Sequence, residues 1–422
     1  MSDLEIYLDG VECGVVTQTS TGNITFHYDE SYRRTQRTPL SLSMPLAAST
    51  HKKRAILPYL QGLLPDSEDA LTAIARRYSV SAKSPVALLS HIGSDVAGAV
   101  QIVVEQGTST DATLSRSDIR PVDDAEVGRM LRHVMSEYSE GVPYYDSVGH
   151  FSLAGAQPKI ALHKDVTGGW NVPQDATPTT HILKPVAGTV RRIDVVEQVT
   201  MQAARVLGSQ VAKSDLETID GVDVFVSERY DRRVVDGEWR RLHQEDLCQA
   251  LSVPPDKKYQ HRDGGPGLAV IAGLIRSLPL ERDRREAGRA FYQAFVFNVV
   301  AGCTDAHAKN YSLMLDGESV RLAPLYDLVT SAPYWNGEAG IDSAMSVNGE
   351  YAFARIGAEM LSKAGKQFGV GDEAADIVAA TREGIFEAFE SAVEGLPESV
   401  KNSRDIVDDL FSGLRALPLV IS

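Results

Sequence analysis

The chain has 422 residues, 43% of them apolar and 23% charged, which is typical of a globular protein with a sizeable core. No run approaches about 18 uninterrupted apolar residues and no basic-then-apolar leader opens the chain, so neither a membrane span nor a secretory signal is expected. The three cysteines are far apart, which argues against a disulfide framework or zinc site and favours the reducing cytoplasm. A net charge of −15 opposes autonomous nucleic-acid binding.

The first hundred residues have the pattern of one αβ unit. Residues 4–29 alternate apolar and polar side chains around DG and TGN turn signals, which predicts a small antiparallel sheet. Residues 55–78 and 84–92 have helical spacing, with Asp66 or Ser67 as a candidate N-cap. We therefore expect a subdomain over residues 1–106, followed by a linker and connecting helix over 107–148.

The remainder, residues 149–422, is expected to be a second domain. Strand patterns cover 151–163, 168–174 and 180–185, and an amphipathic helix over 195–207 stops before Gly208. Another strand runs from 222 into a polar segment. We divide the domain into a part with strands and a helix (149–245) and a helical part (246–422).

The segment CTDAHAKNYSLMLDGESVRLAPLYD carries the strongest functional signal. Asp305 and Asn310 have the spacing D-x-x-x-x-N, and a hairpin-like segment follows and ends at Asp327. In protein kinases, the aspartate of such a loop takes the proton of the acceptor hydroxyl, while the asparagine and a later aspartate hold Mg²⁺. The alternative is a helix capped by Thr304 or Asp305. A helical, Gly302-terminated segment before the loop favours the first interpretation.

His307 lies among these polar groups, beside an apolar strand. Polar side chains against a core are costly unless they are paired or bind a metal. His307 could contact a phosphate or orient the loop, and a structural histidine is an equal alternative.

Two earlier segments could bind phosphates. Ser152, Gly155 and Gln157 lie between a turn and a strand, where small residues let backbone N–H groups approach an anion, although a tight turn alone explains them too. Lys184 ends an apolar strand. Kinases pair such a lysine with a glutamate of the next helix, which here would be Glu197, with Asp194 as a competitor; a solvated strand end is the alternative.

The segment VFVSERYD could hold a nucleobase. After a strand, backbone groups can read the adenine edge, while Tyr230 offers an aromatic face. The alternative is a strand-to-loop transition in which Glu228 and Arg229 are merely exposed.

Taken together, these segments resemble the HipA family, the kinase toxins of bacterial type II toxin–antitoxin modules. The similarity runs in order to about residue 330 and is weaker over the C-terminal hundred residues. The matching segments are PLSLSMPL (39–46), LLPD (63–66), IGSDVAGAVQ (92–101), SLAGAQPK (152–159), TPTTHILKP (177–185), SERYDRR (227–233), QEDLCQ (244–249), GGPG (264–267), TDAHAKN (304–310) and PLYD (324–327).

The resemblance implies an α+β fold: a small N-terminal αβ subdomain and a divergent protein-kinase-like domain with an all-helical C-terminal part. It also implies an ATP- and Mg²⁺-dependent serine/threonine-protein kinase. Toxins of this family modify a translation component such as glutamyl-tRNA synthetase and so cause growth arrest. A HipB-like helix-turn-helix antitoxin would bind the kinase and the operator DNA.

The resemblance also assigns roles to individual residues. Asp305 matches the catalytic aspartate, and Asn310 and Asp327 match the metal-binding pair. The family's phosphate loop, in which a serine can be autophosphorylated, corresponds to Ser152, Leu153, Ala154, Gly155, Ala156 and Gln157, with Ser152 in the place of that serine. The other expected ATP-site residues are Lys184, Glu228, Tyr230, His307 and Tyr326.

Two positions depart from the family pattern. Pro158 stands where glutamate is usual, which could stiffen the loop exit, and Ala306 stands where glycine is common.

Two other functions remain as alternatives. One is a kinase-fold binding protein that acts mainly as an antitoxin-bound co-repressor, and the other is a small-molecule kinase. The complete set of Asp305, Asn310, Asp327 and Lys184 favours the kinase toxin, because a binding module does not need all four.

Overall fold

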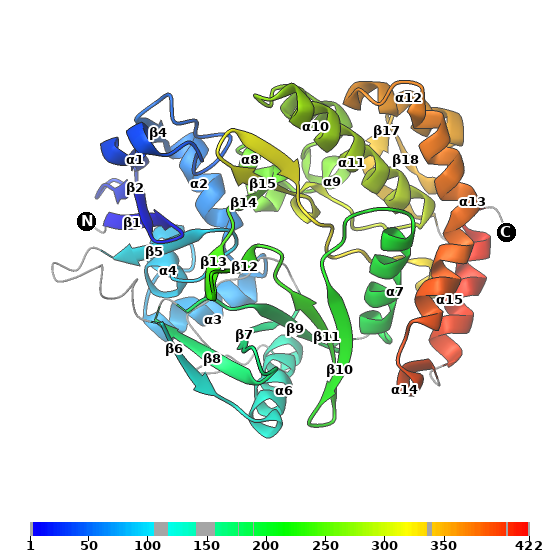
Figure 1. Ribbon diagram of the computed structural model, residues 1–422, viewed down its shortest axis with the longest axis horizontal. Helices are drawn as coiled ribbons and strands as arrows, with labels where there is room; N and C mark the ends of the chain where they lie inside the picture. Colours follow the sequence, from blue (N-terminus) through cyan, green and yellow to red (C-terminus); the bar gives the residue numbers. More distant parts are fainter. Residues whose placement is uncertain are drawn as a thin grey trace. The chain divides into compact units, whose positions relative to one another are not determined.

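An antiparallel five-stranded sheet forms from the N-terminal segment, as its alternating pattern predicts (Figure 1). The strand order is β4-β3-β2-β1-β5. At the first hairpin Asp9 and Gly10 have φ values of 47° and 78°, as a type I′ turn requires. The strands are β1 (Asp3–Leu8), β2 (Val11–Gln18), β3 (Ile24–Tyr28), β4 (Thr50–Lys52) and β5 (Val100–Val104).

The computed structural model describes residues 3–104, 117–140, 157–175, 177–188, 190–335, 340–401 and 404–420. The chain divides into two compact units. The first unit consists of Met1–Thr189, Glu217–Asp256 and Met314–Glu318. The second unit consists of Val190–Leu216, Lys257–Leu313 and Ser319–Ser422.

Four of the described helices accompany the N-terminal sheet in the first unit. Leu4, Ile6, Phe26 and Ile56 belong to its core, and none is more than 1% exposed. Of the two candidate N-caps, Ser67 caps the third helix, where its hydroxyl accepts a hydrogen bond from the N–H of Ala70 at 3.3 Å. The helices are α1 (Glu30–Thr35), α2 (Lys53–Gly62), α3 (Glu68–Tyr78) and α4 (Pro85–Ile92).

A second sheet has the order β10-β11-β9-β7-β8-β6. Helix α6 (Asp124–Glu140) packs on it, and its Val127 and Leu131 are buried with Leu183 and Val224. The division between the units falls within β10. The strands are β6 (Ser117–Pro121), β7 (Ile160–Lys164), β8 (Trp170–Asp175), β9 (His181–Pro185), β10 (Ser214–Ile219) and β11 (Val222–Glu228).

The first unit continues through a hairpin, a short strand and a helical turn. In this unit the N–H of Leu315 donates to the carbonyl of His243 at 3.0 Å, so the Met314–Glu318 segment pairs with the chain next to β14. These elements are β12 (Arg232–Val235), β13 (Glu238–Arg241), β14 (Gln244–Asp246) and α8 (Leu247–Ala250).

The second unit is mainly helical, as its pattern predicts. Helix α13 packs against α7, α11 and α12 (Figure 1), and in α11 Phe291, Phe295 and Phe297 are at most 1% exposed. The helices are α7 (Ile193–Val206), α9 (Gln260–Asp263), α10 (Leu268–Arg276), α11 (Glu281–Val300), α12 (Ala358–Gly365), α13 (Glu373–Glu394), α14 (Glu398–Lys401) and α15 (Arg404–Ala416).

Two hairpins follow helix α11 along the described chain. Strand β15 (Ser312–Asp316) and β16 (Ser319–Leu322) form the expected hairpin before Asp327. A second hairpin, β17 (Asp342–Val347) with β18 (Glu350–Ala352), was not predicted, and it interrupts the C-terminal part that was expected to be all-helical. Its turn carries Asn348 and Gly349 with φ values of 51° and 85°, so the NG signal was present in the sequence.

Candidate active site

The loop that carries Asp305 begins where helix α11 ends. Gly302 has a φ of +69°, and a Cβ added there would lie 2.8 Å from Leu417 Cδ2, so glycine reverses the chain at a crowded point. The N–H of Cys303 donates to the carbonyl of Asn298 at 2.8 Å and closes the helix. The alternative interpretation, a helix capped by Thr304 or Asp305, is wrong, since no helix begins at either residue, and the Asp305 side chain is 63% exposed.

Asn310 closes this loop onto Asp305. Its side-chain Nδ2 donates to the backbone carbonyl of Asp305 at 2.8 Å, and the N–H of His307 donates to the same oxygen at 2.8 Å. The N–H of Asn310 donates to the carbonyl of His307 at 3.0 Å. The D-x-x-x-x-N spacing is therefore the length of a loop in which the asparagine fixes the backbone of the aspartate.

Two rings lie beside the Asp305 carboxylate. The buried His307 places Nε2 3.9 Å from Asp305 Oδ1. The half-buried Tyr259 donates its hydroxyl to the Asp305 carboxylate, and its ring meets that of His307 edge-on at 4.7 Å between centroids. The Arg262 guanidinium lies 4.3 Å from the centre of the Tyr259 ring. Sequence reasoning missed Tyr259, because no spacing rule links it to a loop 46 residues away.

Tyr326 connects the end of the β15–β16 hairpin with this loop. Its hydroxyl donates to the backbone carbonyl of Lys309 at 3.0 Å and lies 2.7 Å from Ser312 Oγ. Tyr326 precedes Asp327 in the chain, and Lys309 precedes Asn310. The hydrogen bond therefore brings together the two segments that carry the predicted metal ligands, as the hairpin pattern predicts.

Asp327 itself has a left-handed backbone with a φ of 54°. Such a conformation costs a non-glycine residue free energy and persists only where its surroundings impose it. Two residues earlier, Leu325 is paired with Gln210 and Ala212 through backbone hydrogen bonds of 2.9 Å each. After it, the N–H of Ser331 donates to the Gly302 carbonyl at 3.0 Å. The Asp327 segment is thus held at both ends, and its far end returns to the start of the Asp305 loop.

The expected nucleotide residues of the first unit lie on neighbouring strands. Lys184 of β9 pairs with Phe225 of β11, and its Nζ lies 5.4 Å from the centre of that ring. Glu228, at the end of β11, pairs with His181. Tyr230 follows, and its hydroxyl donates to Gln244 Oε1 at 2.7 Å.

The proposed partner of Lys184 belongs to the second unit. Glu197 is only 2% exposed within helix α7, and Asp194, its competitor, is held by Arg192 through contacts of 3.1 and 2.8 Å. The pairing of Lys184 with Glu197 remains a prediction.

Most of the expected phosphate loop, residues 152–156, lies outside the described residues. Gln157 is described and half-buried, and Pro158 follows it.

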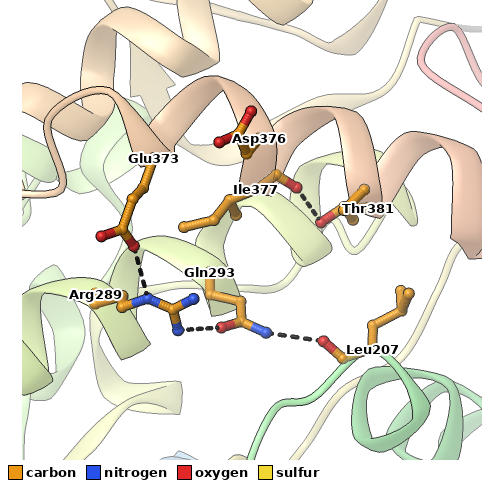
Figure 2. Close-up of a pocket in the computed structure, with 8 residues that line it drawn as sticks. Leu207, Arg289, Gln293, Glu373, Asp376, Ile377 and Thr381 are labelled. Carbon is orange, nitrogen blue, oxygen red and sulfur yellow. Dashed lines mark hydrogen bonds and ion pairs between the residues drawn. The ribbon is translucent and has the colours of Figure 1, made fainter.

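A hollow of about 390 Å³ elsewhere in the second unit contains none of the predicted site residues (Figure 2). Arg289 of α11 bonds both Glu373 of α13 and Gln293, at 3.2 and 3.3 Å, and Gln293 in turn donates to the Leu207 carbonyl at 2.8 Å. Arg289, Gln293 and Glu373 are thus bonded within one short chain of contacts, and we do not assign this hollow to the active site.

Within the described ranges, no cluster of three or more His, Cys, Asp or Glu could hold a metal ion. A kinase-type Mg²⁺ site does not need one, because water and phosphate oxygens complete its coordination. The amide of Asn310 gives its N–H to the Asp305 carbonyl, so its oxygen remains as the cation-binding end. One amide oxygen and the Asp327 carboxylate therefore fit Mg²⁺.

No described helix is long and apolar enough to span a membrane.

An N-terminal sheet subdomain, a second sheet of six strands, a mainly helical unit and this arrangement of acids define the class of kinase-like phosphotransferases. The model described as the HipA-like C-terminal domain matches residues 151–389, and the one described as the HipA N-terminal domain matches residues 4–103. The chain therefore belongs to the HipA family, and the predicted family is confirmed.

Known relatives are similar in sequence to this chain along most of its length. A candidate kinase of Sinorhizobium fredii, Y4mE, is 32% identical over 96% of this chain and 94% of its own length. The serine/threonine-protein kinase toxin HipA of Shewanella oneidensis is 29% identical over 83% of this chain and 81% of its own length.

A solved structure of Shewanella oneidensis MR-1 HipA, with HipB and operator DNA, has a TM-score of 0.81 at 25% identity. The structural match covers 98% of this chain and 96% of the HipA chain. The predicted α+β fold and the serine/threonine-protein kinase class are confirmed, and as a kinase of this family the chain uses ATP.

Proposed function

We propose that the chain is the toxin of a type II toxin–antitoxin module, a Mg²⁺-dependent kinase that phosphorylates serine or threonine of a translation component. The observation that carries this proposal is the set of hydrogen bonds at the Asp305 loop, which involve one predicted metal ligand and the segment of the other. Asn310 holds the Asp305 carbonyl, and the hydrogen bond from Tyr326 to Lys309 brings the Asp327 segment to the same loop. Phosphoryl transfer requires little more of a protein than such positioned oxygen ligands and a carboxylate.

In this proposal Asp305 orients the acceptor hydroxyl and takes its proton. Its exposed carboxylate supports that role, because a protein substrate must reach it. Asn310 and Asp327 would hold Mg²⁺, which supplies charge neutralisation at the phosphates when bound. His307 would orient the loop, since its ring lies beside both Asp305 and Tyr259.

The remaining nucleotide contacts are proposed from the family pattern. Lys184 would meet the phosphates, and Glu228 and Tyr230 would face the adenine. Residues 152–157 would form the phosphate loop, with Ser152 as a site of autophosphorylation. Lys184 lies on β9, Glu228 lies at the end of β11, and Tyr230 follows β11. These positions support the assignments of the three residues to the phosphates and the adenine.

The proposed partner is a HipB-like helix-turn-helix antitoxin. The Shewanella relative has been solved with HipB and operator DNA. The net charge of −15 supports contact with operator DNA mainly through such an antitoxin. We also propose that the phosphorylated protein is a translation component such as glutamyl-tRNA synthetase. The proposed location of the chain is the cytoplasm.

The domain division also remains part of the proposal: an N-terminal subdomain at 1–106, a linker and helix at 107–148, and a kinase-like domain at 149–422. The two matched ranges, 4–103 and 151–389, support it.

The test is transfer of label from γ-labelled ATP with Mg²⁺ to cell-extract proteins and to the chain itself. We expect labelling by wild type, loss of labelling in Asp305→Ala, and wild-type behaviour in Asp316→Ala, a control at an exposed aspartate of the same hairpin. Mass spectrometry identifies the labelled protein and tests Ser152, with Ser152→Ala as control.

Expression of wild type should arrest growth, and co-expression of its cognate HipB-like antitoxin should relieve the arrest. If wild type binds ATP but transfers no label and leaves growth unaffected, the chain is a co-repressor rather than a toxin. Label in a small molecule alone would instead indicate a small-molecule kinase.

A further inference from the structure

Five charged side chains are buried together in the first unit. We call them the buried charge cluster; none is more than 8% exposed. Charged residues are rarely buried unless they are paired. The cluster consists of Asp95, Arg229, Asp231, Arg232 and Arg241.

Asp95 is the centre of the cluster. Arg232 and Arg241 donate to its Oδ1 at 2.9 and 3.3 Å, and Arg229 donates to its Oδ2 at 3.4 Å. Thr179 donates to the same Oδ2 from its N–H at 3.0 Å and from its hydroxyl at 2.6 Å. The Thr179 hydroxyl also accepts from Arg229 at 2.7 Å, so it bridges the two charges.

Two of the arginines also donate hydrogen bonds to the backbone next to Asp95. Arg229 and Arg232 donate to the Val96 carbonyl at 2.8 and 3.0 Å, and Arg232 donates to the Gly98 carbonyl at 2.8 Å. In return, the N–H of Gly98 donates to Asp231 Oδ2 at 2.7 Å. Residues 95–98 belong to the range that matches the HipA N-terminal domain, and residues 229–241 belong to the range of the C-terminal domain.

Both carboxyls of the cluster are ionised at neutral pH. Burial favours a higher pKa for Asp95, but Arg232, Arg229 and Arg241 outweigh it and hold that pKa well below its ordinary value. The pKa of Asp231 is lowered in the same way: burial opposes the shift, while Arg229 and Arg232 dominate. Removing one charge therefore leaves its partners buried and uncompensated.

The cluster lies on the segment that we propose to contact adenine. Side chains alternate from residue 227 to 231: Arg229 and Asp231 are buried, whereas Glu228 and Tyr230 are half-buried. The N–H of Arg229 donates to the Thr180 carbonyl at 2.8 Å, and the N–H of Arg232 donates to the Arg229 carbonyl at 3.2 Å, which closes a turn.

We propose that the buried charge cluster positions the nucleotide: Asp95, from the N-terminal domain, holds Arg229 inward, Arg229 and the Gly98 N–H hold Asp231 inward, and Glu228 and Tyr230 are thereby held towards the adenine. The inference rests on the proposed function and makes the N-terminal domain part of the support of the ATP site. Asp95, Arg229 and Thr179 are positioning residues, because they act through their neighbours and touch no substrate.

The test compares the ATP affinity of variants by titration of a fluorescent ATP analogue, and separates KM for ATP from kcat. Asp95→Asn keeps the shape but removes the charge, while the milder Thr179→Val removes only the bridging hydroxyl. We expect the KM for ATP to rise about tenfold in Asp95→Asn, with kcat at saturating ATP within about twofold of wild type. Thr179→Val should show a smaller rise of the same kind.

Arg240→Gln is the matched control, since Arg240 adjoins Arg241 on β13 but its side chain is 50% exposed. It should leave KM unchanged. Arg229→Lys tests geometry, because lysine keeps the charge but loses the forked contacts, so its KM should rise.

A folded Thr179→Val or Asp95→Asn with the KM of wild type would overturn the inference, even if its melting temperature fell. If Asp95→Asn does not fold, Thr179→Val alone decides. Wild type that binds no ATP would overturn the proposed function together with this inference, whereas normal binding by wild type and both variants overturns the inference only.

Discussion

The hydroxyl of Tyr259 donates a hydrogen bond to the carboxylate of Asp305, the residue that we propose as the catalytic base. The tyrosine is itself packed against His307 and Arg262. One side of the carboxylate is therefore fixed by the protein, and the acceptor hydroxyl must approach the other.

We expect Tyr259→Phe to lower kcat about tenfold, with little change in affinity for ATP, because the base loses its orientation but the nucleotide contacts remain. Steady-state kinetics with saturating ATP measures this. Tyr351→Phe is the control, since Tyr351 stacks on His261 at 4.3 Å instead. A higher kcat in Tyr259→Phe would show that the tyrosine obstructs the base.

Asp327→Asn should separate function from stability. Asparagine tolerates a left-handed backbone as well as aspartate does, so the free energy of unfolding should change by less than about 0.5 kcal/mol. Loss of the carboxylate should lower kinase activity by about 100-fold or more and raise the Mg²⁺ concentration needed for half-maximal activity. Urea unfolding and Mg²⁺ titrations measure the two effects, and a normal Mg²⁺ dependence would contradict the assignment.

Glu245 should make stability fall as pH rises. Burial raises the pKa of its carboxyl from 4.5 to about 8, so the folded chain keeps a proton that the unfolded chain has lost over this window. Stability from this group is thus fully present below about pH 4.5 and is lost as pH rises to about 8, at about 1.4 kcal/mol per pH unit.

Glu245→Gln removes this titration. The difference in unfolding free energy between Glu245→Gln and wild type should therefore increase in favour of the variant between about pH 5 and 8. Urea unfolding at several pH values gives this difference, in which the other titrating groups cancel. A difference independent of pH would show that Glu245 is ionised in the folded protein.

Gly302→Ala should disturb the start of the Asp305 loop. Its left-handed backbone and the contact with Leu417 make alanine costly, and we expect a loss of about 1–3 kcal/mol in stability together with lower activity. Gly273→Ala is the matched control in α10, where an added Cβ meets no atom within 4 Å, and it should stabilise by about 0.5–1 kcal/mol. Thermal unfolding distinguishes the two; equal effects would contradict the backbone argument.

Local patterns predicted the parts of the structure that depend on local rules. The alternation before Tyr28, the N-cap at Ser67 and the spacing from Asp305 to Asn310 all act over a few residues, and the structure contains the elements that they predict. The hairpin at 342–352 was missed because its NG turn lies within a region interpreted as helical.

The features that sequence reasoning missed join distant segments. For Arg229 the sequence leaves an exposed side chain as one of two interpretations, since arginine is normally solvated, but the residue is only 4% exposed. Its partner Asp95 is 134 residues away, and Tyr259 is 46 residues from Asp305. A single sequence contains no distance signal for such pairs.

The division of the chain has a consequence for synthesis on the ribosome. The chain passes between the two units five times, and the last piece of the first unit is Met314–Glu318. The N-terminal sheet can form early, but the first unit is completed only after about three quarters of the chain has emerged. Translation that stops before this point yields an incomplete enzyme, so a cell that makes this kinase holds no complete site until most of the chain has been synthesised.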